Sequence, residues 1–222
     1  RDLTINAIAM DDEGTLYGSY GGQRDLELRV LRHVSNAFVE DPLRVLRVAR
    51  FAARYKTLGF TVAEETLALM QQLADSGELE ALTPERVWKE TSRALMEDHA
   101  DEYFEVLRHG ALKVLFPEIA ALYGIPQRPE YHPEIDCGIH TMMSLQQACR
   151  ANYALDVRFA VLVHDLGKAL TPVDELPRHI MHEERGVKPV TEVCERLKVP
   201  TQMKQLAITV CKEHLKCHQA LT

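Results

Sequence analysis

The sequence predicts a mostly α-helical protein with a small β-containing region at its N-terminus. Apolar residues recur at helical spacing over most of the chain after residue 40. Pro42 and Pro84 each follow a residue that can cap a helix, a pattern that is typical of a helix start. Residues 13–33 instead mix glycine turns with short apolar pairs, a pattern that indicates a hairpin.

Local signals place each element along the chain. Residues 1–12 are expected to begin a helix, because Ile5 and Ile8 have helical spacing. Within the hairpin region, residues 26–32 are either a further strand or an irregular connection. The remaining helices are expected over residues 41–55, 63–73, 83–96, 100–108, 114–123, 138–151, 156–166, 182–197 and 201–218.

Composition narrows the class of protein. The 222 residues are 46% apolar, enough for one or two globular units with a core. An ordinary glycine and proline content excludes collagen-like and low-complexity proteins. No apolar run approaches the roughly 18 residues that a membrane helix needs, so we expect no membrane association. Five scattered cysteines and ten histidines predict a reduced, cytoplasmic protein.

Charge is distributed unevenly along the chain. The net charge is −7, which argues against a uniformly basic nucleic-acid binder. Residues 24–56 nevertheless hold seven Arg and one Lys against four acids, a local charge of +4 that leaves −11 elsewhere. This balance predicts a basic surface for a confined anionic ligand. The chain begins at Arg1 inside a dense motif, and we expect it to be a fragment of a longer protein.

The basic charge is concentrated on the helix expected over residues 41–55. Arg44, Arg47, Arg50 and Arg54 fall within about 120° of one another on a helical wheel. Guanidinium groups bind phosphate oxygens bidentately, and an Asp with an Arg one turn away presents acceptors and donors to a base edge. The alternative is a solvated face with intramolecular salt bridges.

Two motifs, one at the N-terminus and one at the start of this helix, resemble a known family. Residues 1–7 read Arg-Asp-Leu-Thr-Ile-Asn-Ala, and residues 40–47 read Glu-Asp-Pro-Leu-Arg-Val-Leu-Arg. Together they resemble the class II tRNA nucleotidyltransferases, which include CCA-adding enzymes and bacterial poly(A) polymerases. The resemblance implies that Asp41 and Arg44 select the base of CTP or ATP. It also implies further nucleotide contacts from Arg1, Asp2, Arg47 and Arg50.

Other parts of the chain agree with this family or depart from it. Residues 83–90 resemble a Glu-Arg-x-x-x-Glu motif that braces the base-selecting helix. Gly18-Ser19 stands where the family has Asp-Pro, which affects the expected loop geometry. The family's Asp-x-Asp, which holds Mg²⁺ for nucleotidyl transfer, would precede Arg1. We therefore expect no polymerisation by this chain alone, although the intact parent should polymerise.

A second motif lies further along the chain. His164 and Asp165 follow the apolar run 159–163, and a buried His-Asp pair needs a partner such as a divalent metal or a hydrogen-bonding group. The order His140, His164-Asp165, His182 resembles the HD phosphohydrolase superfamily. The resemblance implies metal binding by these four residues and catalysis involving His164, Asp165 and Lys168, with a transition metal such as Ni²⁺. A final Asp ligand would be expected beyond Thr222.

The alternative for this cluster is a satisfied buried histidine with a helix-capping aspartate. His214 is either a metal ligand or a neighbour of the ligands, and its role with Cys211 and Cys217 stays open. The spacing of Cys211, His214, Cys217 and His218 is helical, so the four should not all converge on one zinc ion.

Both resemblances together imply a bacterial CCA-adding enzyme with a C-terminal HD domain. The implied domains are the end of a nucleotidyltransferase head (1–36), a helical neck and body (37–123), a proline-containing linker (124–137) and a truncated all-α HD domain (138–222). The implied partners are tRNA, CTP and ATP, in a monomer or homodimer. The HD domain implies phosphatase and 2′,3′-cyclic phosphodiesterase activity. The alternatives are a stand-alone HD phosphohydrolase fragment and a non-catalytic tRNA-binding scaffold.

Overall fold

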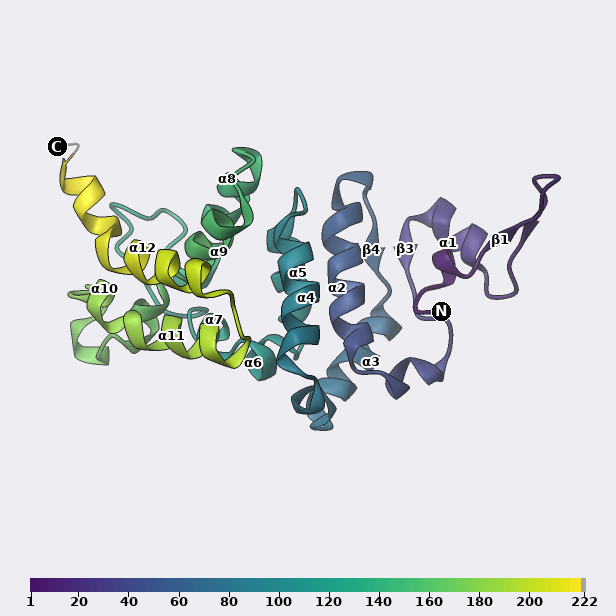
Figure 1. The fold of residues 1–222 in the computed structure, drawn as a ribbon, viewed down its shortest axis with the longest axis horizontal. Coiled ribbons are helices and arrows are strands. Elements are labelled where there is room, and N and C mark those ends of the chain that lie inside the picture. The colour runs from purple at the N-terminus through teal and green to yellow at the C-terminus, as the bar shows by residue number, and fades with distance from the viewer. Residues whose placement is uncertain (221–222) are drawn as a thin grey trace. The chain divides into compact units, whose positions relative to one another are not determined.

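The computed structural model describes residues 1–220, with side chains described through Cys217. It contains two compact units, Arg1–Val114 and Leu115–Thr222. Helices dominate both units, as Figure 1 shows, and the mostly α-helical class predicted from the sequence is confirmed. Within the described residues, no helix is both long enough and apolar enough to cross a membrane.

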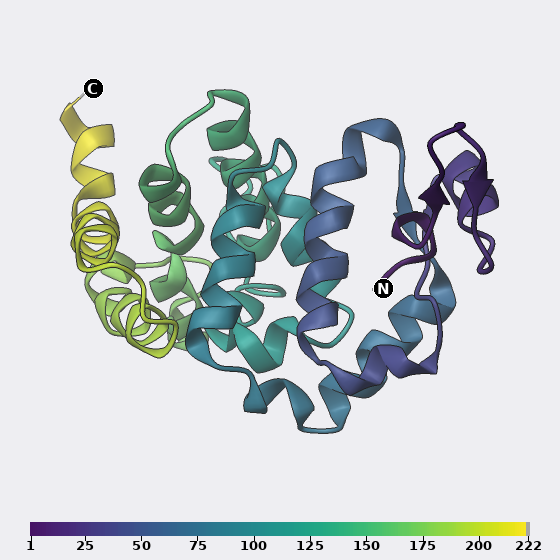
Figure 2. The ribbon, with the colours of Figure 1, turned by 45° about the vertical axis from the view of Figure 1, so that its right-hand side comes forward.

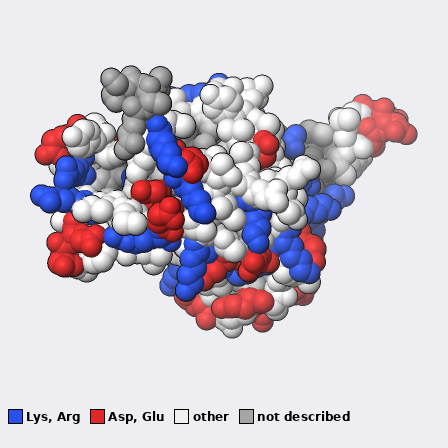
Figure 3. All heavy atoms as spheres, turned by 60° about the vertical axis from the view of Figure 1, so that its left-hand side comes forward, with Lys and Arg blue, Asp and Glu red and all other residues white. Residues whose placement is uncertain are grey.

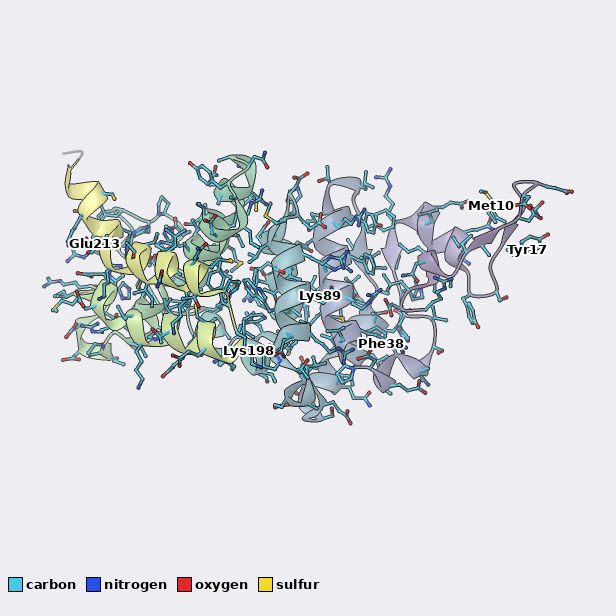
Figure 4. All side chains as sticks on the ribbon, viewed as in Figure 1. Met10, Tyr17, Phe38, Lys89, Lys198 and Glu213 are labelled. Atoms are coloured by element: carbon cyan, nitrogen blue, oxygen red, sulfur yellow. The ribbon has the colours of Figure 1, made fainter. Side chains whose placement is uncertain are left out.

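The N-terminal part of the first unit contains the strands. β1 (Ala9–Met10) pairs antiparallel with β2 (Leu16–Tyr17) in a hairpin, and β3 (Val30–Leu31) pairs parallel with β4 (Thr61–Val62). The hairpin is strongly exposed, since the Met10 and Tyr17 side chains are 69% and 57% accessible (Figure 4). The expected β-containing region at the N-terminus is therefore present.

Two local predictions in this region are wrong. Residues 1–12 form only a short 3₁₀ helix, η1 (Thr4–Asn6), before β1, because Thr4 is tied to distant residues. The Thr4 amide donates to the Arg32 carbonyl at 2.9 Å, and its hydroxyl donates to Asp25 at 2.6 Å. The helix α1 (Gly22–Leu28) covers residues 26–28, where a strand or an irregular connection was expected, whereas β3 confirms a strand at Val30–Leu31 in the rest of that range.

The rest of the first unit is a helical bundle. Its longer helices are α2 (Leu43–Tyr55), α3 (Glu64–Asp75), α4 (Pro84–Leu95) and α5 (Ala100–Leu107). Short 3₁₀ helices connect them: η2 (Asn36–Glu40), η3 (Lys56–Leu58) and η4 (Glu78–Ala81). α2 packs against α4 and α5, as both ribbon views show (Figure 1, Figure 2). The helices expected over residues 41–108 are thus confirmed.

The core of this bundle lies between α2 and α5. Apolar positions of α2, including Val45 and Leu46, are fully buried, as are Tyr103 and Phe104 of α5. The Tyr103 hydroxyl lies 3.0 Å from the Thr91 hydroxyl of α4, so its polar atom has a partner inside the core. This packing fixes α2 and determines which of its residues face solvent.

All the regular elements in the described part of the second unit are helices. α6 (Leu112–Leu115) lies at the division between the units, and the second unit continues with the following elements. They are α7 (Pro117–Ala120), α8 (Cys137–Arg150), α9 (Leu155–Val163), η5 (Leu166–Leu170), η6 (Val173–Glu175), α10 (His182–Arg185), α11 (Val187–Arg196) and α12 (Thr201–Ala220). α9 packs against α8 and α12, while α12 also contacts α10 and α11.

Helix breaks in the second unit follow recognisable residues. The helix expected over residues 114–123 is interrupted before Pro117, as its missing amide hydrogen would require. The helix expected over residues 182–197 is divided at Gly186 into α10 and α11. Residues 124–136 have no regular helix, and residues 128–131 are exposed, yet Gln127 is only 1% exposed and is part of the packed interior.

Charged side chains of both signs are spread over the surface. Figure 3 shows lysines and arginines interspersed with aspartates and glutamates on the face in view.

Candidate cation site and candidate nucleotide-selecting surface

Five elements of the second unit bring polar side chains to one buried carboxylate, that of Asp165. His140 comes from α8, His164 and Asp165 follow α9, and Lys168 lies in η5. His182 begins α10, and His214 comes from α12. Asp165 is only 2% exposed. The sequence-predicted residues of this cluster are therefore neighbours in space.

The Oδ2 atom of Asp165 faces three of these groups. It lies 2.9 Å from Lys168 Nζ, 3.3 Å from His164 Nε2 and 3.6 Å from His140 Nε2. Lys168 is itself only 6% exposed, and its ammonium also donates to Gln127 Oε1 at 2.7 Å. On this side of the carboxylate, a fixed positive charge thus accompanies two imidazoles.

The Oδ1 atom of Asp165 faces the other two histidines. It lies 3.2 Å from His182 Nε2 and 3.4 Å from His214 Nε2. Those two nitrogens are 3.0 Å from each other. Although buried, Asp165 Oδ1 accepts no hydrogen bond among the described groups. A buried carboxylate oxygen without a donor carries a free-energy cost that a cation would remove.

The hydrogen-bond partners of the Nδ1 atoms determine which nitrogen of each ring carries the hydrogen. His182 Nδ1 is 2.8 Å from the His179 carbonyl oxygen, and His214 Nδ1 is 2.9 Å from the Cys211 carbonyl oxygen. A carbonyl oxygen only accepts, so each Nδ1 carries the hydrogen and each neutral ring keeps a lone pair on Nε2. Two nitrogen lone pairs and a carboxylate oxygen therefore meet at one point.

His164 follows the same rule, with Nδ1 2.5 Å from the Val161 carbonyl oxygen. Burial opposes charge on His164, but the adjacent Asp165 carboxylate outweighs it and raises the pKa of the ring. Burial also opposes ionisation of Asp165, yet the charge and the hydrogen bond of the neighbouring His164 ring hold the pKa of its carboxyl well below the usual range. Burial lowers the pKa of His140. Asp165 is thus an anion at neutral pH.

These residues fit a divalent cation. Two groups that include Asp165 have ligand atoms close enough to share one ion: His140 with His164 and Asp165, and His182 with His214 and Asp165. Imidazole nitrogens with a carboxylate oxygen suit zinc, nickel, copper or iron better than magnesium. Outer hydrogen bonds that fix each ring are typical of metal-binding histidines.

Close packing of η5 against α10 holds Asp165 beside His182. A Cβ on Gly167 would lie 1.9 Å from the His182 carbonyl oxygen and 2.6 Å from the Gly186 amide nitrogen. Glycine at position 167 therefore lets η5 approach α10 closely enough for Asp165 and His182 to meet.

Sequence reasoning missed part of this cluster. Gln127 and Glu134 lie in the segment that was expected to be only a linker, and Glu134 Oε1 is 2.6 Å from His140 Nδ1. Neither residue stands in a periodic pattern or a recognised motif, so no sequence signal identified it. The role of His214, which the sequence left open, is now constrained by its contact with Asp165.

The arginines of α2 lie in the first unit, near the N-terminal motif. Asp2 is the centre of this group: its Oδ2 lies 2.5 Å from Arg47 Nε and its Oδ1 lies 3.5 Å from Arg44 Nε. The Arg44 guanidinium also donates to the Ala37 carbonyl. Arg1 is exposed. Asp2, Arg44 and Arg47 thus lie together, although 42 positions separate Asp2 from Arg44.

Asp41 has different partners. Its Oδ1 accepts the Leu43 amide at 3.1 Å at the start of α2, and its Oδ2 lies 3.1 Å from Arg86 Nη2 of α4. Both side chains of the Asp41–Arg86 pair are well exposed, at 39% and 46%. The predicted contact between residues 83–90 and the arginine helix is therefore present.

Arg50 differs from the other arginines that the helical wheel groups on one face, because it is buried. This residue is 3% exposed, and its Nε lies 2.5 Å from Oε2 of Glu90, which is equally buried. Its guanidinium also lies over the Phe51 ring, 4.8 Å from the centroid. A helical wheel places Arg50 with the other arginines, but α4 covers that position and supplies the counter-charge. A nucleotide contact by Arg50 stays a prediction.

Sequence similarity to known proteins shows which proteins this chain is related to. A multifunctional CCA protein of Acinetobacter baumannii (strain ATCC 17978) is 78% identical over 223 residues, covering 100% of this chain and 54% of the relative. The chain is a homologue of the multifunctional CCA proteins. The multifunctional CCA protein of Pseudomonas fluorescens (strain SBW25) is 62% identical with the same coverage. The chain spans about half the length of the curated relatives it matches.

Family and structure comparisons agree with this homology. The family described as "Probable RNA and SrmB-binding site of polymerase A" matches residues 59–123. A CCA-adding enzyme solved in complex with ATP is 25% identical, with a TM-score of 0.62, covering 96% of this chain and 46% of that one. A Thermotoga maritima CCA-adding enzyme complexed with tRNA is 23% identical, with a TM-score of 0.59, covering 100% and 58%. The latter likeness supports the fold alone.

Proposed function

We propose that this chain forms the base-selecting part of an enzyme that adds CCA to the 3′ end of tRNA from CTP and ATP. The proposal is supported above all by 78% identity to a multifunctional CCA protein over the whole chain. The side chains at the start of α2 are consistent with it, because Asp2, Arg44 and Arg47 gather there beside Asp41. Nucleotidyl transfer would also require a divalent cation held by carboxylates.

Base selection would use the Asp41 carboxylate, whose present ion pair can be broken at little cost in free energy. The exposed Asp41–Arg86 pair contributes only about 0–1 kcal/mol, so a base can replace Arg86 as the partner of Asp41 at little cost. The Asp41 carboxylate accepts hydrogen bonds, while the Arg44 guanidinium donates them. Together they can read the donor and acceptor pattern of cytosine and then of adenine. The Arg47 guanidinium supplies positive charge for the phosphates.

Replacing Arg44 with alanine tests this role in the full-length protein. We expect a loss of about 1–3 kcal/mol of discrimination, or about 5- to 150-fold, for CTP and ATP against UTP and GTP. Incorporation of each labelled nucleotide into tRNA lacking its CCA end measures the ratio. Arg93→Ala, an exposed arginine of α4, is the matched control. Unchanged selectivity in the Arg44 variant would refute base reading by this residue.

We further propose that the cluster around Asp165 is a cation-dependent phosphohydrolase site with phosphatase and 2′,3′-cyclic phosphodiesterase activity. The supporting observation is the convergence of imidazole Nε2 atoms on a buried carboxylate whose Oδ1 accepts no hydrogen bond among the described groups. A bound divalent cation would supply an activated water and neutralise phosphate charge. Asp165 and the histidines would hold that cation, and the Lys168 ammonium would offer positive charge to the phosphate.

Phosphate release from 2′-AMP by the purified chain tests the second activity. We expect turnover with at least one of Ni²⁺, Co²⁺, Mn²⁺ and Mg²⁺, and its loss in the His164→Ala/Asp165→Ala double variant. Opening of 2′,3′-cyclic AMP should follow the same metal preference. Silence of the chain with every metal, repeated with the full-length protein, would reject the hydrolase proposal.

A further inference from the structure

We propose that Glu134 is a positioning residue of the Asp165 cation site, where its carboxylate fixes the ring of His140 with Nε2 directed at Asp165. This inference deepens the proposed hydrolase function and rests on it. Glu134 lies before α8 in the segment between α7 and α8, and its side chain is 11% exposed. Its Oε1 is 2.6 Å from His140 Nδ1, while His140 Nε2 lies 3.6 Å from Asp165 Oδ2.

The other three histidines show why His140 needs such a partner. In each of them, Nδ1 donates to a main-chain carbonyl three residues earlier in the chain. The pairs are His164 with Val161, His182 with His179, and His214 with Cys211. Each carbonyl places the hydrogen on Nδ1 and leaves Nε2 free to bind a cation.

His140 departs from this pattern. Three residues before it stands Cys137, whose carbonyl accepts the Thr141 hydroxyl at 2.9 Å. The Nδ1 atom of His140 points instead to Glu134. A carboxylate therefore takes the place that a main-chain carbonyl has for the other rings. The Glu134 carboxylate also makes Nε2 of His140 more electron-rich than a neutral carbonyl would, because a charged acceptor draws the Nδ1 hydrogen more strongly.

A second possible role for Glu134, as a ligand of a separate cation, must be distinguished from the positioning role. His132 Nδ1 lies 3.4 Å from Glu134 Oε1, and its ring meets the His140 ring edge-on with 4.7 Å between centroids. His132, Glu134 and His140 could therefore hold a cation of their own. The short Glu134–His140 contact favours a hydrogen bond over a shared ion, because Nδ1 cannot carry a hydrogen and bind a metal at once.

Three variants of the chain separate these roles. Glu134→Ala removes the acceptor, Glu134→Gln keeps an amide oxygen that can accept from Nδ1, and Glu130→Gln changes an exposed glutamate of the same segment as the control. Long-range ¹H–¹⁵N NMR of the histidine rings reports the tautomer of His140 directly. We expect the Nδ1–H form in the wild-type chain and the Glu134→Gln variant, and a mixture of tautomers in Glu134→Ala.

Zn²⁺ titration by calorimetry supplies the second readout. We expect about 10- to 100-fold weaker binding in Glu134→Ala, a smaller loss in Glu134→Gln, and the wild-type affinity in Glu130→Gln. An unchanged His140 tautomer in Glu134→Ala, or wild-type Zn²⁺ affinity in that variant, would overturn the inference. Loss of one bound ion per chain in both Glu134 variants, with the other ion retained, would identify Glu134 as a ligand and also overturn it. A shifted tautomer with weakened Zn²⁺ binding, but no hydrolysis by any form of the protein, would support this inference and reject only the hydrolase proposal.

Discussion

Replacing Asp165 with asparagine is expected to abolish tight divalent-cation binding by this chain. The carboxylate is the one anion that all the converging histidines face, and it is 2% exposed. Loss of an outer hydrogen-bond partner already weakens metal binding by about 10- to 100-fold, so loss of the anionic ligand itself should weaken it by about 100-fold or more. Calorimetric titration with Zn²⁺ and Ni²⁺ measures the change.

Two further variants make this result interpretable. Asp174→Asn alters an exposed aspartate of the same unit and should bind cations as the wild-type chain does. Asp165→Asn leaves the Lys168 ammonium buried without its carboxylate, which reduces stability in its own right. The double variant Asp165→Asn/Lys168→Met removes that charge and should regain stability without regaining affinity. Tight binding by either Asp165 variant would show that the cation lies elsewhere.

Replacing Glu90 with glutamine is expected to destabilise the first unit by about 3–5 kcal/mol, because it leaves the Arg50 guanidinium buried without a counter-charge. Chemical denaturation followed by circular dichroism measures the loss. Glu78→Gln, an exposed glutamate, is the control and should lie within about 0.5 kcal/mol of wild type.

A double replacement tests the mechanism of this effect. Arg50→Met/Glu90→Leu removes both charges together and should recover most of the lost stability, since apolar substitutes for a buried ion pair are often neutral or stabilising. Equal stability of Glu90→Gln and Glu78→Gln would contradict the inference that the Arg50–Glu90 pair joins α2 to α4.

Local patterns in the sequence predicted the helices after residue 40 well and the first twelve residues poorly. The prolines at positions 42 and 84 mark helix starts that the structure contains, because capping is decided by neighbouring residues. The N-terminal segment instead depends on Thr4 bonding to residues more than 20 positions away. Pairing at such distances overrides helical spacing, and no window of local sequence contains it.

The same distinction separates the predicted and missed residues of the cation site. His140, His164, Asp165 and His182 were predicted from motifs whose order a sequence preserves. Glu134 and Gln127 act through contacts that depend on how residues 124–136 fold back over the cluster. Arg50 shows a related limit, since a helical wheel cannot tell which face α4 will cover.

If histidine Nε2 atoms and Asp165 together form a cation site, the chain should bind nickel through imidazole rings. X-ray absorption at the nickel edge, recorded on the purified chain after loading with Ni²⁺ and desalting, tests this binding. We expect retained nickel, with the outer-shell scattering of imidazole rings and at least one oxygen ligand. The Asp165→Asn variant, treated in the same way, should retain little nickel. A spectrum from wild-type chain with oxygen ligands alone, or nickel lost on desalting, would show that these residues do not form the site.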